Sequence, residues 1–496
     1  MRKNDGSWYE TATRQSKVAI LLIIFNVIKS LIRNWWPILI VVVFRSDILT
    51  PGQGRSILIV VGLAIIVFSI ISYYRFYFFL KQDKLHVQRG VFTRSNMDIP
   101  FDRIQTISFE QGIVHQLFDV VKVKIDTAGS SKDEFEFAAL PKSKANELRS
   151  FILSRKTMQT GESDGKTPSP DKNLIMALRP MDLLKVGVSQ NHLRTAGIIL
   201  AFFLGLRDRI DEALGQQYVD RFDRFAADLF DNAFTVLILM VIALLVIAFA
   251  STLVLTFLRF YNLKVWTSKD GYYVQGGLFN RREQAALNHK IQIIRSMSNP
   301  IRKLFNIVYF RFHQASSRGI TRSSTISIPG CTIESLAHIR RSYFGSAIEK
   351  HFSHWGVAKQ LFYRRWLIIG WIPFLILLVA HWTLSLPSIL VISIVWLILS
   401  AFFQWVYQRD WRLSVNEELL QTHSGVLEKV TKIMHLYKIQ SVEIRQTPYQ
   451  RRHDLVSLVF YTASGAVRVP FITEAIALQV KDYTLYKIES ADRKWM

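Results

Sequence analysis

The sequence alternates long apolar stretches with strongly basic blocks. A membrane span needs about 20 predominantly apolar residues, and six stretches approach that length. Ala233–Leu258 is the clearest because it holds no charged residue, and His192–Leu206 is the shortest. We predict spans within Val18–Phe44 (from about Leu31), Ser56–Tyr74, His192–Leu206, Ala233–Leu258, Trp366–Trp382 and Ser385–Phe403.

The six predicted spans form three pairs, which are joined by connections with few basic residues: Arg45–Arg55, Arg207–Asn232 and His381–Ser388. Nearly all the positive surplus lies in the other segments. Lys and Arg accumulate on the cytoplasmic side of membrane proteins. We therefore predict a multi-pass protein of the cell membrane, with both termini and the segments between the pairs in the cytoplasm. No signal-peptide cleavage pattern follows the polar N-terminus.

An internal repeat follows each pair of spans. An apolar strand leads to a glycine turn, at Gly90, Gly277 and Gly425, and a basic residue followed by Ile-Gln comes thirteen residues later. Fifteen residues further come Phe118, Phe305 and His453, and ten residues after these come Ala128, Ala315 and Ala463. Because these motifs recur three times with the same spacings, the sequence predicts three copies of one structural unit. The basic residues of these triplets are Arg103, Lys290 and Lys438.

Each unit continues as short strands with glycine or polar turns and ends in a helix. Alternating strands are predicted at Val120–Thr127, Ile307–Gln314 and Leu455–Thr462, and helices at Lys142–Arg155, Ile333–Phe344 and Ile472–Ile488. The predicted fold is a membrane protein with three repeats, each of two transmembrane helices followed by a β-rich domain. The predicted segments are helix pairs at 1–80, 174–260 and 351–408, β-rich domains at 81–155, 261–350 and 409–496, and a flexible linker at 156–173.

The net charge of +24 comes from 62 Lys and Arg against 38 Asp and Glu. In a chain that is half apolar, an anionic membrane surface is a simpler partner for basic segments than a nucleic acid. We therefore predict no nucleic-acid partner, while anionic membrane lipids remain candidates. The single cysteine, Cys331, excludes disulfide frameworks and cysteine-ligated metal sites by count.

No motif in the sequence indicates an enzyme. The chain lacks a phosphate-binding glycine loop with a following Lys-Ser/Thr, a His-Glu-x-x-His pair and a Gly-x-Ser-x-Gly elbow. His351 and His354 could form half of a metal site, but no third ligand stands at a recognised spacing. We expect no catalytic residue, no cofactor and no metal.

Seven basic residues are candidate contacts to lipid headgroups or to an interface. They are the triplet cations Arg103, Lys290 and Lys438, and the pairs Arg302-Lys303 and Arg451-Arg452, which precede the alternating strands. A cation near an anionic membrane surface contributes about 1 kcal/mol of attraction. The alternative interpretation is that the triplet fixes a strand while its cation is solvated or paired within its own domain.

The paired spans, the glycine turn, the triplet and the strand ends Thr127-Ala128-Gly129 and Thr462-Ala463-Ser464-Gly465 resemble the bacterial pleckstrin-homology-like membrane family, in particular its three-unit members. The resemblance covers nearly the whole chain. It implies split barrels of about seven strands, each capped by a C-terminal helix. It also implies a smaller membrane partner with one helix pair and one such domain, and a link to tolerance of antimicrobial peptides. The third unit departs from the pattern, since Arg452-His453 replaces the Leu-Phe of the first two.

The sequence therefore predicts a non-enzymatic membrane platform with three cytosolic domains. Its expected role is assembly with the smaller partner and protection of the envelope against antimicrobial peptides. Two other interpretations stay open. One is a transporter or exporter without an ATP site, although charge is nearly absent from the spans. The other is a sensor that binds anionic lipid.

Overall fold

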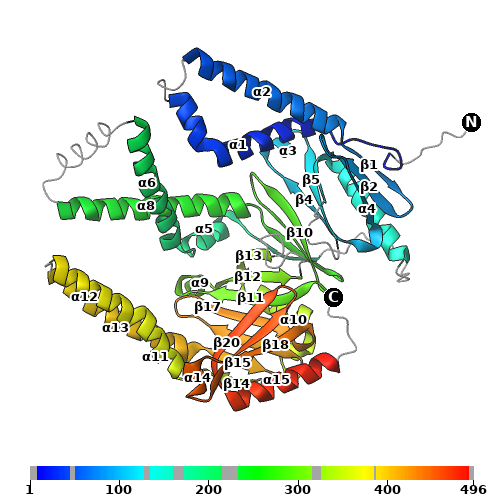
Figure 1. The fold of residues 1–496 in the computed structure, drawn as a ribbon. Coiled ribbons are helices and arrows are strands. Elements are labelled where there is room, and N and C mark those ends of the chain that lie inside the picture. The colour runs from blue at the N-terminus through cyan, green and yellow to red at the C-terminus, as the bar shows by residue number, and fades with distance from the viewer. Residues whose placement is uncertain are drawn as a thin grey trace, which may run out of the picture. The chain divides into compact units, whose positions relative to one another are not determined.

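The computed structural model describes residues 8–44, 51–127, 135–159, 173–214, 233–315, 325–384 and 387–490 (Figure 1). The chain divides into two compact units. The first holds Met1–Asp171, Arg179–Leu263 and Gln275–Ala285, and the second holds Lys172–Leu178, Lys264–Val274 and Ala286–Met496. Residues 160–172 of the predicted linker and residues 128–129 of the first strand end lie outside the described residues.

The apolar stretches form helices. They are α1 (Val18–Phe44), α2 (Pro51–Tyr74), α6 (His192–Leu214), α8 (Ala233–Phe260), α12 (Ile372–Leu384) and α13 (Pro387–Asp410). Within the described residues, three segments are long and apolar enough to cross a membrane: Ile238–Phe260, Gln360–Thr383 and Pro387–Asp410. The apolar parts of the other three helices are shorter, at Val18–Leu31, Ile59–Tyr74 and His192–Gly205. The organisation in six spans therefore stays a prediction.

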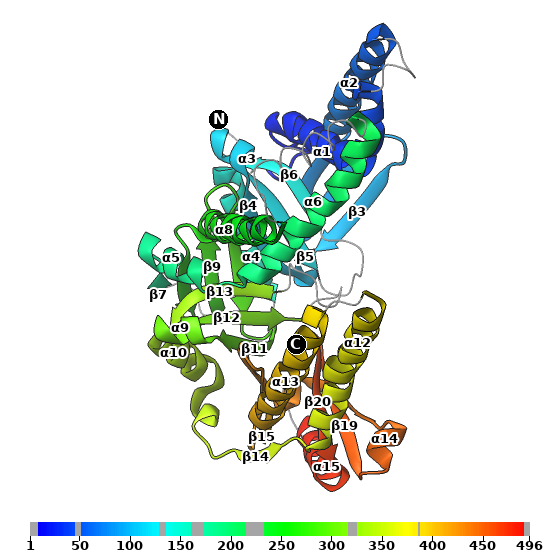
Figure 2. The same cartoon turned by 90° about the vertical axis from the view of Figure 1, so that its left-hand side faces the viewer.

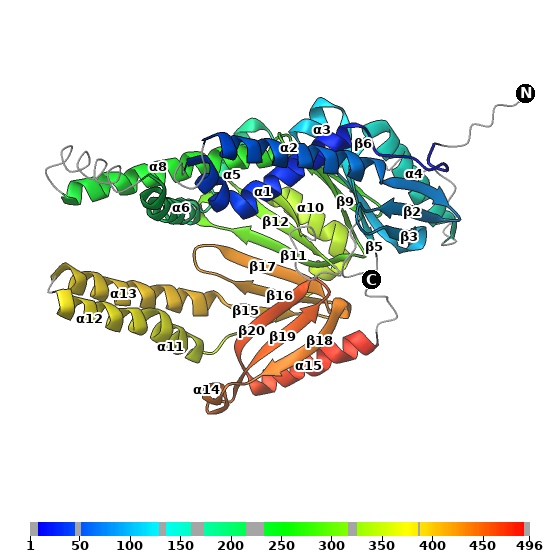
Figure 3. The same ribbon diagram turned by 45° about the horizontal axis from the view of Figure 1, so that its top comes forward.

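The apolar helices pack in sequential pairs. In the first unit α1 contacts α2 and α6 contacts α8, and in the second unit α12 contacts α13 (Figure 3). The last pair is held closely, because Trp396 Nε1 donates to the carbonyl of Ile369 at 3.0 Å and Trp366 Nε1 donates to that of Leu397 at 3.3 Å. A π-helical turn, η4 (Leu367–Trp371), joins α11 (Gln360–Trp366) to α12 at this contact.

The first β-rich domain lies in the first unit and consists of two antiparallel sheets with strand orders β1-β2-β3 and β6-β5-β4. Alternate side chains point inward, and Phe78, Leu85, Phe135 and Phe137 are fully buried. Its elements are β1 (Tyr77–Lys81), β2 (Lys84–Arg89), β3 (Ser95–Pro100), η1 (Phe101–Arg103), β4 (Ile104–Gln111), α3 (Ile113–Leu117), β5 (Val120–Thr127), β6 (Phe135–Pro141) and α4 (Lys142–Gln159).

The second β-rich domain contributes strands to both units. Its helix α10 begins at an N-cap, where Thr332 Oγ1 accepts from the backbone N–H of Ser335 at 3.2 Å, and it ends at Gly345, whose φ is 59°. The elements from β7 onward are β7 (Asn173–Ala177), α5 (Pro180–Val188), β8 (Lys264–Ser268), β9 (Gly271–Gly276), β10 (Arg281–Leu287), β11 (Ile291–Ser298), α9 (Pro300–Leu304), β12 (Ile307–Gln314), β13 (Thr325–Thr332), α10 (Ile333–Phe344) and η3 (Gly345–Ile348).

The third β-rich domain lies in the second unit, and helix α15 packs on β18, β19 and β20; Figure 2 shows α15 near β19 and β20. Its core includes Leu413, Leu420, Leu458 and Phe460, which are fully buried. The elements are β14 (Ser353–Gly356), β15 (Arg412–Val415), β16 (Leu419–Ser424), β17 (Lys429–His435), η5 (Leu436–Lys438), β18 (Ile439–Arg445), α14 (Pro448–Arg451), β19 (Leu455–Thr462), β20 (Gly465–Thr473) and α15 (Glu474–Glu489).

A strand that precedes each of the last two helix pairs joins the sheet that follows the pair, which the sequence did not predict. Strand β14 lies within the segment 351–408 assigned to the third helix pair, yet it pairs with β15 from Ser353 opposite Val415 to Gly356 opposite Arg412. Strand β7 pairs with β8 in the same way. Ahead of the first pair, Thr13 exchanges two backbone hydrogen bonds of 2.9 Å with Phe78. The second and third helix pairs therefore each connect two neighbouring strands of one sheet, and an isolated bridge takes the place of the strand ahead of the first pair.

The predicted alternating strands are confirmed at β5, β12 and β19, with the same bounds. The helix predicted at Ile333–Phe344 is also confirmed with its bounds, and that predicted at Lys142–Arg155 extends to Gln159. The last helix begins at Glu474 because Ile472 and Thr473 still pair with β19.

The three turn glycines have φ values of 119°, 111° and 121° at Gly90, Gly277 and Gly425. A Cβ at Gly425 would lie 2.0 Å from the carbonyl oxygen of Glu428. Only glycine adopts this conformation without strain. The repeated glycine of the sequence is therefore explained by the backbone of the turn.

Candidate functional site

Strand pairing joins the first β-rich domain to the second. Strand β10 runs antiparallel to β4, with Arg281 opposite Gln111 and Arg282 opposite Glu110. The pairing is reinforced on one side by an ion pair of 2.9 Å between Arg149 on α4 and Glu283 on β10. We call the β4–β10 pairing the first junction.

A second junction joins the second domain to the third. Strand β17 runs antiparallel to β11, with Lys429 opposite Ser298 and Val430 opposite Met297. In the second unit this pairing produces one seven-stranded sheet, in the order β13-β12-β11-β17-β16-β15-β14. Backbone hydrogen bonds therefore continue from one domain into the next.

The triplet cation Lys438 lies at the second junction and is 2% exposed. Its Nζ donates to the carbonyls of Asn288, His289 and Ile291 at 3.0, 3.2 and 2.6 Å, and to the hydroxyl of Tyr343 at 3.0 Å. All four acceptors belong to the second domain. Burial lowers the pKa of Lys438 to about 8. The hydrogen bonds to the carbonyls favour the charged ammonium form of Lys438 and therefore oppose the effect of burial.

The other two triplet cations differ in exposure. Lys290 is 2% exposed, like Lys438, whereas Arg103 at the start of the series is exposed to solvent. The triplet cation is therefore buried in the second and third β-rich domains and exposed in the first.

The junctions have a second contact at the end that faces the transmembrane helices. In the first unit the turn after Gly277 hydrogen-bonds the end of α8, since Leu278 N donates to the carbonyl of Leu258 at 2.9 Å. Gln116 on α3 donates from Nε2 to the carbonyl of Leu278 at 3.0 Å. The short helix α3 of one domain thus contacts the glycine turn of the next.

The second unit repeats this contact with charged groups. Arg302 on α9 is 5% exposed and pairs with Glu428 in the glycine turn of the third domain at 2.7 Å. The next residue, Lys429, pairs with Asp410 at the end of α13 at 2.7 Å. Arg302 therefore contacts protein at a junction rather than solvent.

The remaining candidate cations are exposed on the same short helices. They are Lys303 on α9, Arg451 on α14 and Arg452 directly after it. Leu117 and Leu304, which occupy the position of Arg452 in the first two domains, are 77% and 78% exposed. Since this position is exposed in all three domains, the departure from Leu-Phe in the third changes its surface chemistry and not its core.

A row of cations crosses the second junction. Arg295 on β11 lies directly opposite Arg311 on β12 and opposite Lys432 on β17. Like charges directly opposite each other destabilise a sheet. The pKa of Arg295 is lowered by burial and then by the charge of Arg311, and burial lowers the pKa of Lys432. This row attracts anions.

His313 lies two residues after Arg311 on the same strand, β12, and therefore on the same face of the sheet. Its pKa is lowered to about 4 by burial and then by the charges of Arg295, Arg311 and Lys432. The imidazole is therefore neutral at physiological pH.

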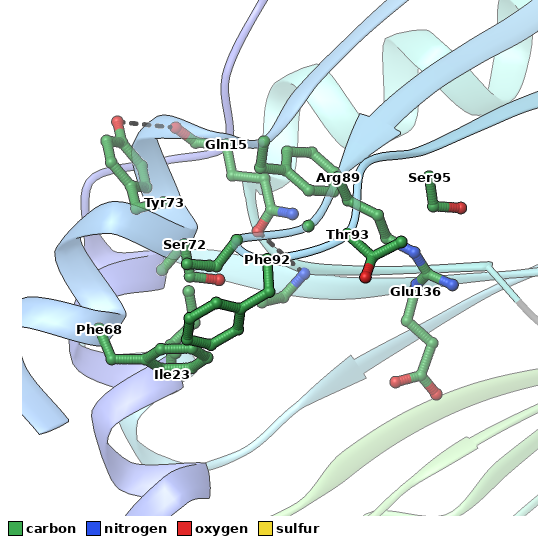
Figure 4. Close-up of a pocket in the computed structure, with 15 residues that line it drawn as sticks. Gln15, Ile23, Phe68, Ser72, Tyr73, Arg89, Phe92, Thr93, Ser95 and Glu136 are labelled. Atoms are coloured by element: carbon green, nitrogen blue, oxygen red, sulfur yellow. Dashed lines mark hydrogen bonds between the residues drawn. The ribbon is translucent and has the colours of Figure 1, made fainter.

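A pocket of about 550 Å³ lies in the first unit between the ends of α1 and α2 and the turn after β2 (Figure 4). The rings of Phe68 on α2 and Phe92 in the turn stack at this pocket, with 6.3 Å between their centroids. Gln15 is fixed at its side, because Oε1 accepts from the backbone N–H of Ala138 at 3.0 Å. Arg89 contributes a cation and Phe92 is 92% exposed. The lining therefore combines apolar rings with polar groups beside an apolar helix.

A neighbouring pocket of about 420 Å³ carries more positive charge. Arg14, Arg75 and Arg94 line it together with Tyr74, Tyr77 and the apolar side chains of α2. The guanidinium of Arg14 lies over the rings of Tyr74 and Tyr77, at 5.1 and 4.6 Å from their centroids. Three cations next to aliphatic side chains suit an anionic group that is attached to an acyl chain.

The described residues contain no group of three or more His, Cys, Asp or Glu side chains that could hold a metal ion. His354 Nδ1 instead lies 2.7 Å from Ser414 Oγ on β15. The Arg-rich hairpin at 316–324, which includes Arg318 and Arg322, lies outside the described residues.

Sequence reasoning missed three features of these sites: the carbonyl contacts of Lys438, the cation row and the two pockets. The row had a visible signal, because Arg295 and Arg311 stand inside strongly apolar strands. The Lys438 contacts had none, because three of their four acceptors are backbone carbonyls.

Comparison with known proteins adds to this picture. The sequence model of the bacterial PH domain matches residues 20–156, 223–346 and 367–488. The chain is also 22% identical over 466 residues to the UPF0699 transmembrane protein YdbT of Bacillus subtilis (strain 168), which covers 92% of each chain. Both similarities extend over all three repeats and agree with the resemblance seen in the sequence motifs.

Replacing Lys438 by Met should destabilise the second junction by roughly 2–3 kcal/mol, because the substitution leaves buried carbonyls without their charged donor. The matched change Arg103→Met, at the exposed triplet, should alter stability by less than about 0.5 kcal/mol. Thermal unfolding of the two purified full-length variants measures both. Equal effects would show that the Lys438 contacts contribute nothing.

Stability should depend on pH through His313. Its folded pKa of about 4 lies below the unfolded value of 6.5. Between these values the unfolded chain binds a proton that the folded protein does not, so this contribution is lost as the pH falls from 6.5 to about 4. His313→Gln should reduce the acid-induced loss by up to roughly 3 kcal/mol. The control His338→Gln, at an exposed position on α10, should leave the acid dependence as it is in the parent.

Proposed function

The chain belongs to the bacterial PH domain family, and from that premise we propose that it is a non-enzymatic assembly platform of the cell membrane. It holds its three PH-like domains on the cytoplasmic side, where the basic segments of the sequence favour them. Six helices in three pairs anchor these domains. The observation that carries the proposal is the joining of successive domains by strand pairing at both junctions.

Strand pairing supports a role in binding proteins because it forms a continuous series of domains. Such a series presents sheet edges, helix faces and exposed cations to other molecules, and strand edges readily accept further strands. We therefore assign the platform the role of holding partners together at the membrane.

The proposed partner is the smaller relative that the resemblance implies, with one helix pair and one PH-like domain. The proposed physiological role is protection of the envelope against cationic antimicrobial peptides. A platform that recruits a second membrane protein can act on the bilayer without chemistry of its own.

Deletion of the gene for either protein should increase killing by a cationic pore-forming peptide while growth without the peptide continues, because the complex would act only under that stress. Killing curves of the two single deletions and the double deletion measure this, and the tagged large protein should retain the smaller one through purification. Restoring each gene provides the control. Deletions as resistant as the parent, without co-purification, would exclude this function.

A second candidate function, binding of anionic lipid as a sensor, is favoured by the 420 Å³ pocket with its three arginines. Changing Arg14 and Arg75 together to Gln should reduce the number of anionic lipids that the full-length protein retains from nanodiscs. Native mass spectrometry counts these lipids. Lys142→Gln removes an exposed cation from α4 and is the matched control. Equal retention by all three proteins would exclude the pocket as a lipid site.

A further inference from the structure

The two junctions have the same register. In each, the residue four positions after the turn glycine (Arg281, Lys429) lies opposite the residue seven positions after the triplet isoleucine (Gln111, Ser298). At both junctions, a strand from the first half of one domain (β10 or β17) therefore pairs with a strand from the second half of the preceding domain (β4 or β11), and the register is the same.

The contact to the glycine turn occurs at both junctions, and the second junction adds a contact of its triplet cation. Lys438 donates to backbone carbonyls in the triplet turn of the preceding domain. At the opposite end of each junction, a side chain on a short helix binds the glycine turn of the next domain. This side chain is Gln116 at the first junction and Arg302 at the second. Both junctions thus combine two paired strands with a polar side chain from a short helix, and the second also contains the triplet cation Lys438.

The series leaves one strand at each end. Among the described strands, β3 lies at the edge of the sheet β1-β2-β3, and β18 lies at the edge of the sheet β18-β19-β20. Beside β3 stands the exposed triplet cation Arg103, and beside β18 stands the short helix α14 with the exposed Arg451. One end therefore carries an edge strand and a triplet cation (β3 and Arg103), and the other carries an edge strand and a short helix with a polar side chain (β18 and Arg451).

We propose that β18 of one copy of this chain pairs with β3 of a second copy, in the register of the two internal junctions. Counting from the glycine and the triplet places Ser95 of the second copy opposite Arg445, and Asn96 opposite Ile444. Arg103 of the second copy then donates to the triplet turn of the first, at the carbonyls of Leu436, Tyr437 and Ile439. Arg451 reaches the glycine turn that follows Gly90.

A second copy is the occupant that the structure itself supplies. The interface continues one that already occurs twice within the chain, and both complementary edges belong to the same sequence. The contact is head-to-tail, so each copy that joins leaves the same pair of ends exposed until a ring closes. This inference is independent of the smaller partner proposed above.

The test uses two co-expressed full-length copies with different tags, one carrying Ser95→Cys and the other Arg445→Cys. Directly opposite residues of antiparallel strands have Cα atoms about 4.5–5.5 Å apart, which permits a disulfide. Cys331 is buried and burial raises the pKa of its thiol to about 12, so it can stay in place. Mild oxidation of native membranes should give a disulfide-linked dimer that carries both tags.

Two further sets of variants test the register of the β18–β3 pairing and the contribution of Arg103 to it. Asn96→Cys with Arg445→Cys is one residue out of register and places the thiols on opposite faces of the sheet, so its mixed dimer should be several times weaker. Adding Arg103→Glu to the Ser95→Cys copy should reduce the mixed dimer severalfold, while Lys142→Glu on α4 should not.

The inference is wrong if membrane-inserted copies give no mixed dimer, or if the in-register and out-of-register pairs cross-link equally. It is also wrong if the Arg445→Cys copy cross-links to a single-domain relative in place of the second copy. That last outcome would support the proposed partner, so the two proposals can fail separately.

Discussion

Backbone hydrogen bonds between strands of successive domains are the constraint on which the rest of this structure depends. A strand at the edge of a sheet exposes unpaired N–H and C=O groups, and the β-rich domains satisfy many of these groups on each other. Because β10 pairs with β4, part of the second domain is grouped with the first. The repeats of the sequence and the compact units of the structure consequently have different boundaries. Neither junction can open without exposing a row of backbone groups.

The same constraint explains how a strongly basic protein buries some of its cations. Lys438 is almost fully buried because three carbonyls and a hydroxyl converge on its ammonium group. Arg302 is buried against Glu428, an acidic residue of the next domain. A buried charge is costly unless it is paired or hydrogen-bonded. The junctions supply these partners, and exposed cations such as Arg103 and Arg451 remain where the described chain offers no neighbouring domain.

The sequence predicted much of the local structure and little of how the domains join. Strands β5, β12 and β19 followed from alternation, and α10 could be delimited because Thr332 caps it and Gly345 ends it. The triplet was visible as a pattern, but its cation contacts backbone atoms about 150 residues away, and backbone carbonyls carry no sequence signal. Strand β14 was assigned to a helix pair because four residues beside an apolar segment show no clear alternation. Contacts that depend on the register of distant strands cannot be read from local periodicity.

Strand β14, ahead of the third helix pair, has a mechanical consequence. A domain attached to the membrane through a single linker can swivel about that linker. Here the helices α12 and α13 are tied at both ends, since the chain reaches them from β14 and leaves them into β15, the neighbouring strand of the same sheet. A change in the tilt of these helices would therefore displace two adjacent, hydrogen-bonded strands at the same time. Because β15, β16, β17 and β11 are successive strands of one sheet, the orientation of this helix pair is coupled to the second junction through continuous backbone hydrogen bonds.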